Sequence, residues 1–425
     1  MKRPGRKIEI WVFAHWKPLS EPVLMGRLQS ELLRGKEVFS FEYDETWLRS
    51  EYGQQLDPDL RLYSGKQYLT DDKPNFGLFL DSSPDRWGRV LMRRREAAMA
   101  RKERRQEEPL FETDYLLGVY DEYRMGALRF KLELDGPFLN DDRDMASPPW
   151  TSIRTLEEIS LLLENDEGAD DPDYIKWLGV LMAPGSSLGG ARPKASILDT
   201  NNHLWIAKFP SQNDQTDIGG WEMVAHELAR QAGLNVSQAM ARKFSSRHHT
   251  FLTKRFDRTP NGRRVHFASA MTLLGYKDGQ NYQDGVSYLD LVEFLMTYGA
   301  KIEQDLKELW RRIVFSICVS NTDDHLRNHG FLLTPQGWVL SPAYDINPVE
   351  KGTGLSLHVT ETDNALSLDL PMEVFEYFRL REKEALLIIE EVKRAVRNWK
   401  AVASEYGLPK AEQSLKSQAF SEAGG

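Results

Sequence analysis

The chain has 425 residues, of which 41% are hydrophobic and 28% charged, with 30 Gly and 20 Pro. This composition is that of a globular protein and excludes collagen-like, coiled-coil and disordered classes, and the length predicts two or three packed units. The formal net charge of −9 gives no overall attraction to nucleic acid. Cys318 is the single cysteine, which excludes an internal disulfide or a cysteine-based metal site and fits a reducing cytoplasm.

The N-terminal residues 8–13 predict a strand, because Glu9 interrupts their apolar run and His15 and Lys17 follow closely, unlike in a signal peptide. No window approaches the roughly 20 apolar residues of a membrane helix, so we expect a cytoplasmic protein with no membrane partner. The run 135–149 mixes Gly, Pro, Asn and Asp and predicts a linker with a domain boundary near residue 150.

In the middle of the chain, a glycine-rich segment precedes two apolar runs that a polar turn at 199–202 separates. This pattern predicts a glycine-rich turn followed by a hairpin with strands at 194–198 and 203–209. Helices are expected where apolar residues recur at spacings of three and four, in 221–232, 306–317 and 388–399. The last stretch, 410–425, lacks this periodicity, and we expect it to be frayed.

The glycine-rich segment, Ser186 to Lys194, consists of small residues whose backbone can approach phosphates and offer N–H donors. It lacks the Gly-Lys-Ser/Thr ending of a Walker loop, and a purely structural tight turn is the alternative.

Lys208 interrupts an otherwise apolar strand, and a buried ammonium there would need an anion. Glu222 lies beside the apolar stripe of the helix predicted at 221–232, near its N-terminal end. A Lys208–Glu222 ion pair is therefore one interpretation. The alternatives are an edge-strand lysine that faces solvent and a glutamate placed favourably at a helix N-terminus.

The strongest signal is the segment Asn321 to Asn328, which follows a predicted buried helix and precedes a predicted hairpin, 330–340, and then Asp345. Asp323 and Asn328 are five positions apart, as in the protein-kinase catalytic loop, and the magnesium-binding Asp of kinases likewise follows a hairpin. Asp323 is therefore predicted to accept the substrate hydroxyl proton, and Asn328 and Asp345 to bind Mg²⁺ on ATP.

A metal hydrolase is an alternative interpretation, with Asp323, Asp324 and His325 binding a metal together with His248 or His249. Consecutive side chains diverge in any regular element, and Asp324 and His325 can instead hydrogen-bond the loop backbone, which disfavours this alternative.

Together these residues resemble one family, the HipA-like serine/threonine kinases of bacterial toxin–antitoxin systems, over most of the chain. The similar segments are 187–194, 206–210, 228–234, 255–258, 322–328, 344–345 and, in the N-terminal part, 85–89. Two departures are Arg192-Pro193, where a Gln-Xaa pair is common, and Lys254, and neither removes a catalytic group.

The resemblance implies an α+β, two-lobed protein-kinase-like fold. It implies a HipA-type N-terminal subdomain at 1–150, an N-lobe-like region with the glycine loop at 151–258, and a helical C-lobe with the catalytic loop at 259–425. It also implies ATP and Mg²⁺ as cofactors and phosphorylation of a protein substrate, typically an aminoacyl-tRNA synthetase. The implied partner is a helix-turn-helix antitoxin that restrains the kinase, so operator DNA would be contacted only through that complex.

By the same resemblance, Ser187, Gly189 and Gly190 cover the nucleotide, Ser187 is autophosphorylated, and the adenosine is held by Lys254, Phe256 and Asp257. An unmodified turn serine is the alternative at position 187. For the whole protein the alternatives are a small-molecule kinase on the same scaffold and a non-catalytic regulator of a DNA-bound partner. The basic stretch 89–105 predicts a solvated helix face or a contact with the antitoxin or its DNA.

Overall fold

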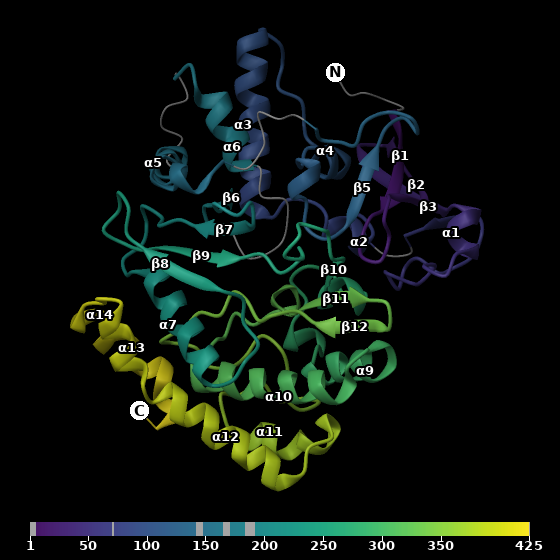
Figure 1. Cartoon of the computed structure of the whole chain (residues 1–425). Coiled ribbons are helices and arrows are strands. Elements are labelled where there is room, and N and C mark those ends of the chain that lie inside the picture. The colour runs from purple at the N-terminus through teal and green to yellow at the C-terminus, as the bar shows by residue number, and fades with distance from the viewer. Residues whose placement is uncertain (1–5, 70–71, 142–147, 165–170, 183–191, 425) are drawn as a thin grey trace. The chain divides into compact units, whose positions relative to one another are not determined.

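The computed structural model describes residues 6–69, 72–141, 148–164, 171–182 and 192–424. They form two compact units. Figure 1 colours the chain by residue number. The first unit comprises Met1–Ala207 and Asp257–Ala268, and the second comprises Lys208–Phe256 and Ser269–Gly425. The three-part division expected above stays a prediction.

The first unit contains a five-stranded sheet of order β4-β3-β2-β1-β5 (Figure 1). Its strands are β1 (Lys7–Ala14), β2 (Val23–Leu33), β3 (Lys36–Tyr43), β4 (Lys66–Tyr68) and β5 (Leu128–Lys131). Neighbouring strands are antiparallel, and the alternate residues Ile10, Val12 and Ala14 of β1 are fully buried. The strand predicted at residues 8–13 is therefore confirmed.

In the sequence, the first helix of this unit lies between β3 and β4, the next three lie between β4 and β5, and the last two follow β5. They are α1 (Glu45–Arg49), α2 (Gly77–Leu80), α3 (Arg86–Glu103), α4 (Glu112–Leu117), α5 (Ile153–Glu164) and α6 (Tyr174–Met182), with short 3₁₀ turns η1 (Asp121–Tyr123) and η3 (Trp150–Ser152). The strands β6 (Lys194–Leu198) and β7 (Leu204–Lys208) follow, and they confirm the predicted hairpin around residues 199–202.

The basic stretch 89–105 covers most of helix α3 and the two residues after it, and Asp85 caps the helix by accepting the Gly88 N–H. The last turn is exposed, and Arg105 pairs with Glu96 and Glu103 of the same helix. The C-terminal half of the stretch is thus a solvated helix face, as one of the two interpretations predicts.

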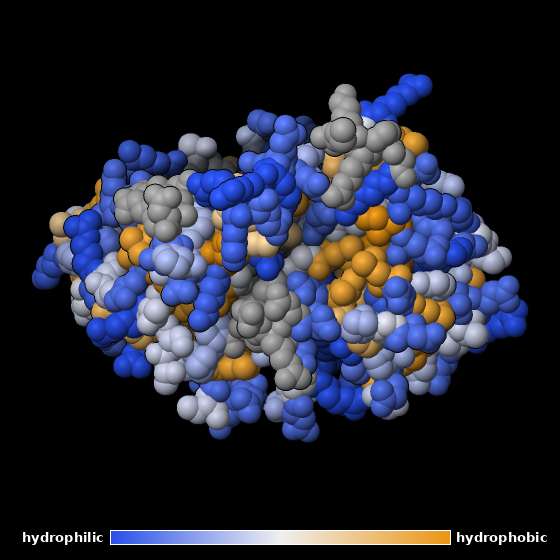
Figure 2. Space-filling model, turned by 90° about the horizontal axis from the view of Figure 1, so that it is seen from above, coloured by the Kyte–Doolittle hydropathy of each residue, from blue (hydrophilic) through white to orange (hydrophobic). Residues whose placement is uncertain are grey.

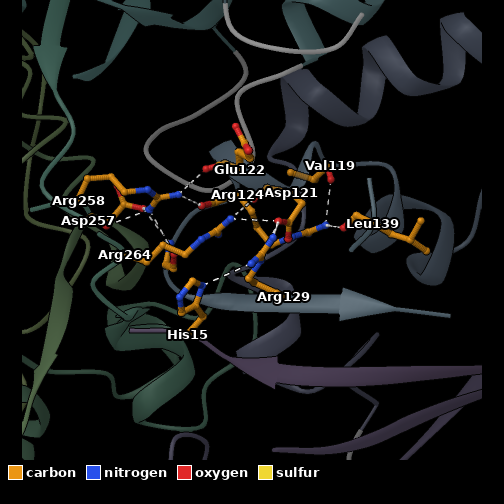
Figure 3. Close-up of polar contacts among 11 residues, drawn as sticks. His15, Val119, Asp121, Glu122, Arg124, Arg129, Leu139, Asp257, Arg258 and Arg264 are labelled. Carbon is orange, nitrogen blue, oxygen red and sulfur yellow. Dashed lines mark hydrogen bonds and ion pairs between the residues drawn. The ribbon is translucent and has the colours of Figure 1, made fainter. Parts of the chain in front are cut away.

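A buried network of arginines holds the irregular segments of the first unit (Figure 3). Arg124 is fully buried and donates to the backbone carbonyls of Val119 and Leu139, among others. The carboxylate of Asp121 lies 2.6 Å from the guanidinium of Arg129 and also contacts Arg264. Burial lowers the pKa of Arg124 to about 10, and the charge of Asp121 partly opposes this decrease. The guanidinium of Arg124 therefore stays charged at neutral pH.

The second unit is mainly helical. Its helices are α7 (Ile218–Gln231), α8 (Ala270–Leu273), α9 (Tyr288–Tyr298), α10 (Ile302–Cys318), α11 (Asp369–Val374), α12 (Glu382–Val396), α13 (Trp399–Glu405) and α14 (Lys410–Lys416), with 3₁₀ turns η4 (Tyr282–Asp284), η5 (Leu326–Asn328), η6 (Phe375–Phe378) and η7 (Ser417–Ala423). Its strands are β8 (Ala239–Arg242), β9 (Thr250–Lys254), β11 (Gly330–Thr334) and β12 (Gly337–Leu340), and β10 (Phe267–Ser269) spans the unit boundary.

The predicted helical patterns correspond to α7, α10 and α12, and the predicted hairpin is the antiparallel pair β11–β12. The stripe of α10 is buried from Leu306 to Ile317, and it ends at the buried Cys318. The pattern at 388–399 was expected to be one helix, but α12 ends at Val396 and Trp399 begins α13.

The expectation that residues 410–425 are frayed is wrong. Residues 410–423 form α14 and η7, and Phe420 is fully buried with its ring stacked 4.5 Å from that of Trp399. Trp221 of α7 lies against the same two rings. Because these partners come from distant parts of the sequence, the segment itself carries no periodic signal.

Hydrophilic residues cover most of the face shown in Figure 2, and hydrophobic residues form scattered patches between them. This surface agrees with the 28% of charged residues in the sequence. In the described part of the chain, no helix combines the length and the apolar character needed to cross a membrane.

Candidate active site

Lys208, at the end of β7, lies between two carboxylates of the second unit. Its Nζ is 2.5 Å from Oε1 of Glu222 and 2.6 Å from Oδ1 of Asp345, and the side chain is only 6% exposed. Burial disfavours the ammonium, but the charges of Asp345 and Glu222 more than offset this effect and raise the pKa of Lys208 above its usual value. The expected Lys208–Glu222 pair is present, and the solvent-facing alternative is wrong.

Helix α7 presents Glu222 to this lysine. Asp217 caps the helix by accepting the Gly220 N–H, and the same carboxylate lies 2.6 Å from Nδ1 of His249. A Cβ at Gly219 would lie 2.1 Å from the backbone oxygen of His249, so only glycine allows this close approach between α7 and β9. Glu222 lies beyond the first turn of α7, which contains no acidic residue, and the helix-terminus alternative therefore does not explain it.

Asp345 has a left-handed backbone, with φ of +57°. This conformation is uncommon for a residue other than glycine, and it persists where surrounding structure holds it. Here the backbone is held on both sides of Asp345. The N–H of Ala343 donates to the carbonyl of Asn235 over 2.8 Å, and that of Asn347 donates to Oδ1 of Asn321 over 3.1 Å.

The loop 321–328 is hydrogen-bonded to the segment that carries Asp345. Tyr344 donates its hydroxyl to the carbonyl of Arg327 over 2.7 Å, and Ser356 donates to the carbonyl of Thr322 over 2.8 Å. With the bond between Asn347 and Asn321, these contacts bring the two predicted catalytic segments together.

Within the loop, the side chain of Asp323 is exposed and its carbonyl accepts from Nδ2 of Asn328 over 2.8 Å. This bond fixes the amide of Asn328, whose buried Oδ1 has no hydrogen-bond partner among the described residues. Oδ1 of Asn347 is likewise buried without a partner in that part of the chain. Two unsatisfied amide oxygens and the carboxylate of Asp345 are hard oxygen donors of the kind that Mg²⁺ takes.

Asn347 is a candidate functional residue that the sequence pattern missed. Its only sequence signal is its position two residues after Asp345. Its Nδ2 lies 3.5 Å from Oδ1 of Asp345, so the amide borders the carboxylate.

The carboxylate of Asp324 is occupied by protein partners, which argues against its role as a metal ligand in a hydrolase. Its carboxylate is buried, accepts from the hydroxyl of Tyr288 over 2.6 Å and lies 3.0 Å from Nε2 of His329. Burial raises its pKa, but His329 and Tyr288 more than offset this and lower it. Among the described residues, no cluster of three or more His, Cys, Asp or Glu side chains could hold a metal ion.

The residues expected around the adenosine have different surroundings. Lys254 ends β9, and the ring of Phe256 lies 5.6 Å from that of Tyr344, next to Asp345. Asp257 belongs to the first unit, where its buried carboxylate accepts from the Gly126 N–H and pairs with Arg258 (Figure 3). Ser187, Gly189 and Gly190 of the glycine loop lie outside the described residues.

Comparison with known families adds independent evidence. Residues 186–399 match the model of the HipA-like C-terminal domain, and this range is half of the chain. The chain belongs to the HipA-like family. The resemblance stated from the motifs is thereby confirmed.

Two curated proteins are similar to part of this chain. The protein named "Putative kinase Y4dM" of Sinorhizobium fredii is 29% identical over 231 residues, which cover 49% of this chain and 54% of the relative. A protein of Haemophilus influenzae with the same kinase designation is 23% identical over 179 residues, which cover 38% of this chain and 52% of the relative. The match therefore spans about half the length of each relative.

A solved structure matches almost the whole chain. It is the Shewanella oneidensis MR-1 toxin–antitoxin complex of HipA, HipB and operator DNA, one chain of which aligns with a TM-score of 0.65 and 17% identity. The alignment covers 97% of this chain and 96% of that chain. This likeness confirms the expected α+β, kinase-like fold.

Proposed function

We propose that this protein is an ATP- and Mg²⁺-dependent serine/threonine protein kinase that acts as the toxin of a toxin–antitoxin pair. The observation that carries the proposal is Lys208, which bridges Glu222 and Asp345 in a buried site. A lysine paired with a helix glutamate, next to an aspartate after a hairpin, is the arrangement that kinases use to hold ATP phosphates. Membership of the HipA-like family supports the same activity.

Asn328, Asp345 and Asn347 are the residues that would hold the metal, because their oxygens are available or negatively charged and lie on segments that hydrogen bonds join. When bound, Mg²⁺ would neutralise negative charge on the ATP phosphates. Lys208 then donates to phosphate oxygens while Glu222 keeps its ammonium in place. Asp323, whose side chain is exposed, accepts the proton of the attacking substrate hydroxyl.

The finer assignments are part of the same proposal. The glycine loop with Gly189 and Gly190 covers the phosphates, and Lys254 and Phe256 hold the adenosine. Asp257 is not assigned to the adenosine, because its buried carboxylate already accepts from the Gly126 N–H and pairs with Arg258 within the first unit. Ser187 is the autophosphorylation site, and the substrate is a cellular protein such as an aminoacyl-tRNA synthetase. The HipA of Shewanella oneidensis was solved with HipB and operator DNA, and we assign to this chain a similar helix-turn-helix antitoxin that contacts the DNA.

The test is incubation of the protein with γ-labelled ATP, Mg²⁺ and a cell extract, with Asp323→Asn as the matched control. We expect label on a discrete protein band and on the kinase itself, with at least about a 10²-fold loss in the control. Label confined to metabolites would indicate a small-molecule kinase. The absence of any transfer, with retained binding of a DNA-bound partner, would indicate a regulator. Mass spectrometry of Ser187 tests the autophosphorylation site.

A further inference from the structure

The C-terminal helix α14 contacts the helix that carries Glu222. Oε2 of Glu412 accepts the backbone N–H of Asp217 and the indole N–H of Trp221, each over 3.0 Å. Asp217 is the cap of α7, and Trp221 precedes Glu222 directly. A single carboxylate of α14 therefore fixes the beginning of α7 at two points.

One turn further along, α14 contacts the segment that carries Asp345. Nζ of Lys416 donates to the carbonyl of Pro348 over 3.0 Å and to Oε2 of Glu350 over 2.7 Å. Lys416 is 6% exposed, and these two partners take the place of solvent around its ammonium. Burial raises the pKa of Glu350, but the hydrogen bond and charge of Lys416 more than offset this and lower it.

Glu222 and Asp345 are thus connected twice. Lys208 joins their carboxylates directly, and α14 joins their parent segments through Glu412 and Lys416. The two connections differ in how nucleotide affects them. In the proposed kinase, the ammonium of Lys208 would donate to phosphate and Asp345 would hold a cation. The contacts of α14 involve none of the side chains assigned to the nucleotide or the metal.

We propose that α14 is a positioning element for the nucleotide and metal site, with Glu412 and Lys416 as the positioning residues. It keeps α7 and the Asp345 segment at a fixed separation when the ammonium of Lys208 turns to phosphate. This inference rests on the proposed function. Outer contacts that hold metal ligands typically contribute 10- to 100-fold to metal affinity, and a loss of about that size is expected here.

The experiment compares Lys416→Met and Glu412→Ala with wild type in the full chain. Binding of Mn²⁺, as a probe for Mg²⁺, is measured by calorimetry with a non-hydrolysable ATP analogue, together with KM for Mg·ATP, kcat and the melting temperature. Lys410→Met is the matched control, because Lys410 begins the same helix and is exposed. Lys416→Arg and Glu412→Gln are the conservative variants that retain a donor and an acceptor.

We expect both disruptive variants to bind the metal about tenfold more weakly and to raise KM, with recovery in the conservative variants and no change in the control. Unchanged metal binding and KM in folded Glu412→Ala, whatever its melting temperature, would reduce α14 to a stabilising element and overturn the inference. That variant is the second test should Lys416→Met not fold. Wild-type protein that binds no Mg·ATP would instead overturn the proposed function.

Discussion

Lys208 compensates two carboxylates at once, which gives its removal an unusual signature. Lys208→Met leaves Glu222 and Asp345 close together without a cation, and breaking a buried pair typically costs about 3–5 kcal/mol. We expect the variant to be inactive and less stable, and to be stabilised by millimolar Mg²⁺ more than wild type is, because the metal replaces the missing charge at Asp345. Thermal unfolding with and without Mg²⁺ measures this. An equal Mg²⁺ effect in both proteins would contradict a metal site at Asp345.

The residues of the site differ in how well the sequence predicts them. Lys208 was identifiable because a charge in an apolar strand needs a partner, and Asp323, Asn328 and Asp345 were identifiable from their order and spacing. Asn347 was not, since its significance is an unsatisfied oxygen that only the folded loop creates. The contact between Lys208 and Asp345 joins residues 137 positions apart, and no local pattern encodes it.

At the scale of elements, the approach of α7 to β9 is set by Gly219. Gly219 lies in the first turn of α7, and a Cβ at this position would collide with the His249 backbone. We expect Gly219→Ala to destabilise the protein by at least about 1–3 kcal/mol and to weaken nucleotide binding, because α7 must move away with Glu222.

Urea unfolding checks the sign of this effect. Gly220→Ala is the comparison, since its Cβ would meet only side chains closely, a methyl group of Leu408 at 2.7 Å and the carboxylate of Asp217 at 3.0 Å, and no backbone atom. A Gly219→Ala protein as stable as wild type would show that the spacing of α7 and β9 is adjustable.

The elements that the sequence predicted best were those with a local signal. The hairpin β11–β12 and the buried stripe of α10 follow from alternation and helical periodicity, and they were confirmed. The helix α14 could not be predicted, because Glu412 and Lys416 are polar residues whose partners lie about 195 and 66 positions away. Phe420 gave no periodic signal for the same reason.

At the scale of the whole molecule, the division into units follows contacts rather than chain order. Residues 257–268 belong to the first unit, although the sequence placed a boundary inside this range. Asp257 and Arg264 join the buried charges of that unit, and the ring of His266 stacks 5.0 Å from that of Trp16. A boundary inferred from the order of motifs along the chain cannot detect a short segment that returns to an earlier unit.

His266 makes this unit sensitive to acid. Burial lowers the pKa of His266 from 6.5 to about 3. Between pH 6.5 and about pH 3, this imidazole is therefore protonated in the unfolded chain and neutral in the folded protein. Stability contributed by neutral His266 is therefore complete above pH 6.5 and falls as pH decreases toward 3, at up to about 1.4 kcal/mol per pH unit.

We expect His266→Phe, which keeps a ring against Trp16, to lose less stability than wild type between about pH 6.5 and about pH 4.5. Urea unfolding followed by circular dichroism gives both pH profiles. The two should be parallel above pH 7, and identical slopes below it would show that His266 does not control acid unfolding.

The buried thiol of Cys318 provides a built-in reporter of opening. Cys318 ends helix α10 with no exposed surface, and burial raises its pKa to about 12. In the folded state a reagent therefore cannot reach the sulfur, and the thiol stays protonated at neutral pH. A disulfide reagent should therefore react only with molecules in which this helix has opened, at a rate that follows the free energy of that opening. Mg·ATP should slow the reaction if binding stabilises the second unit, and every engineered surface cysteine can be labelled without background.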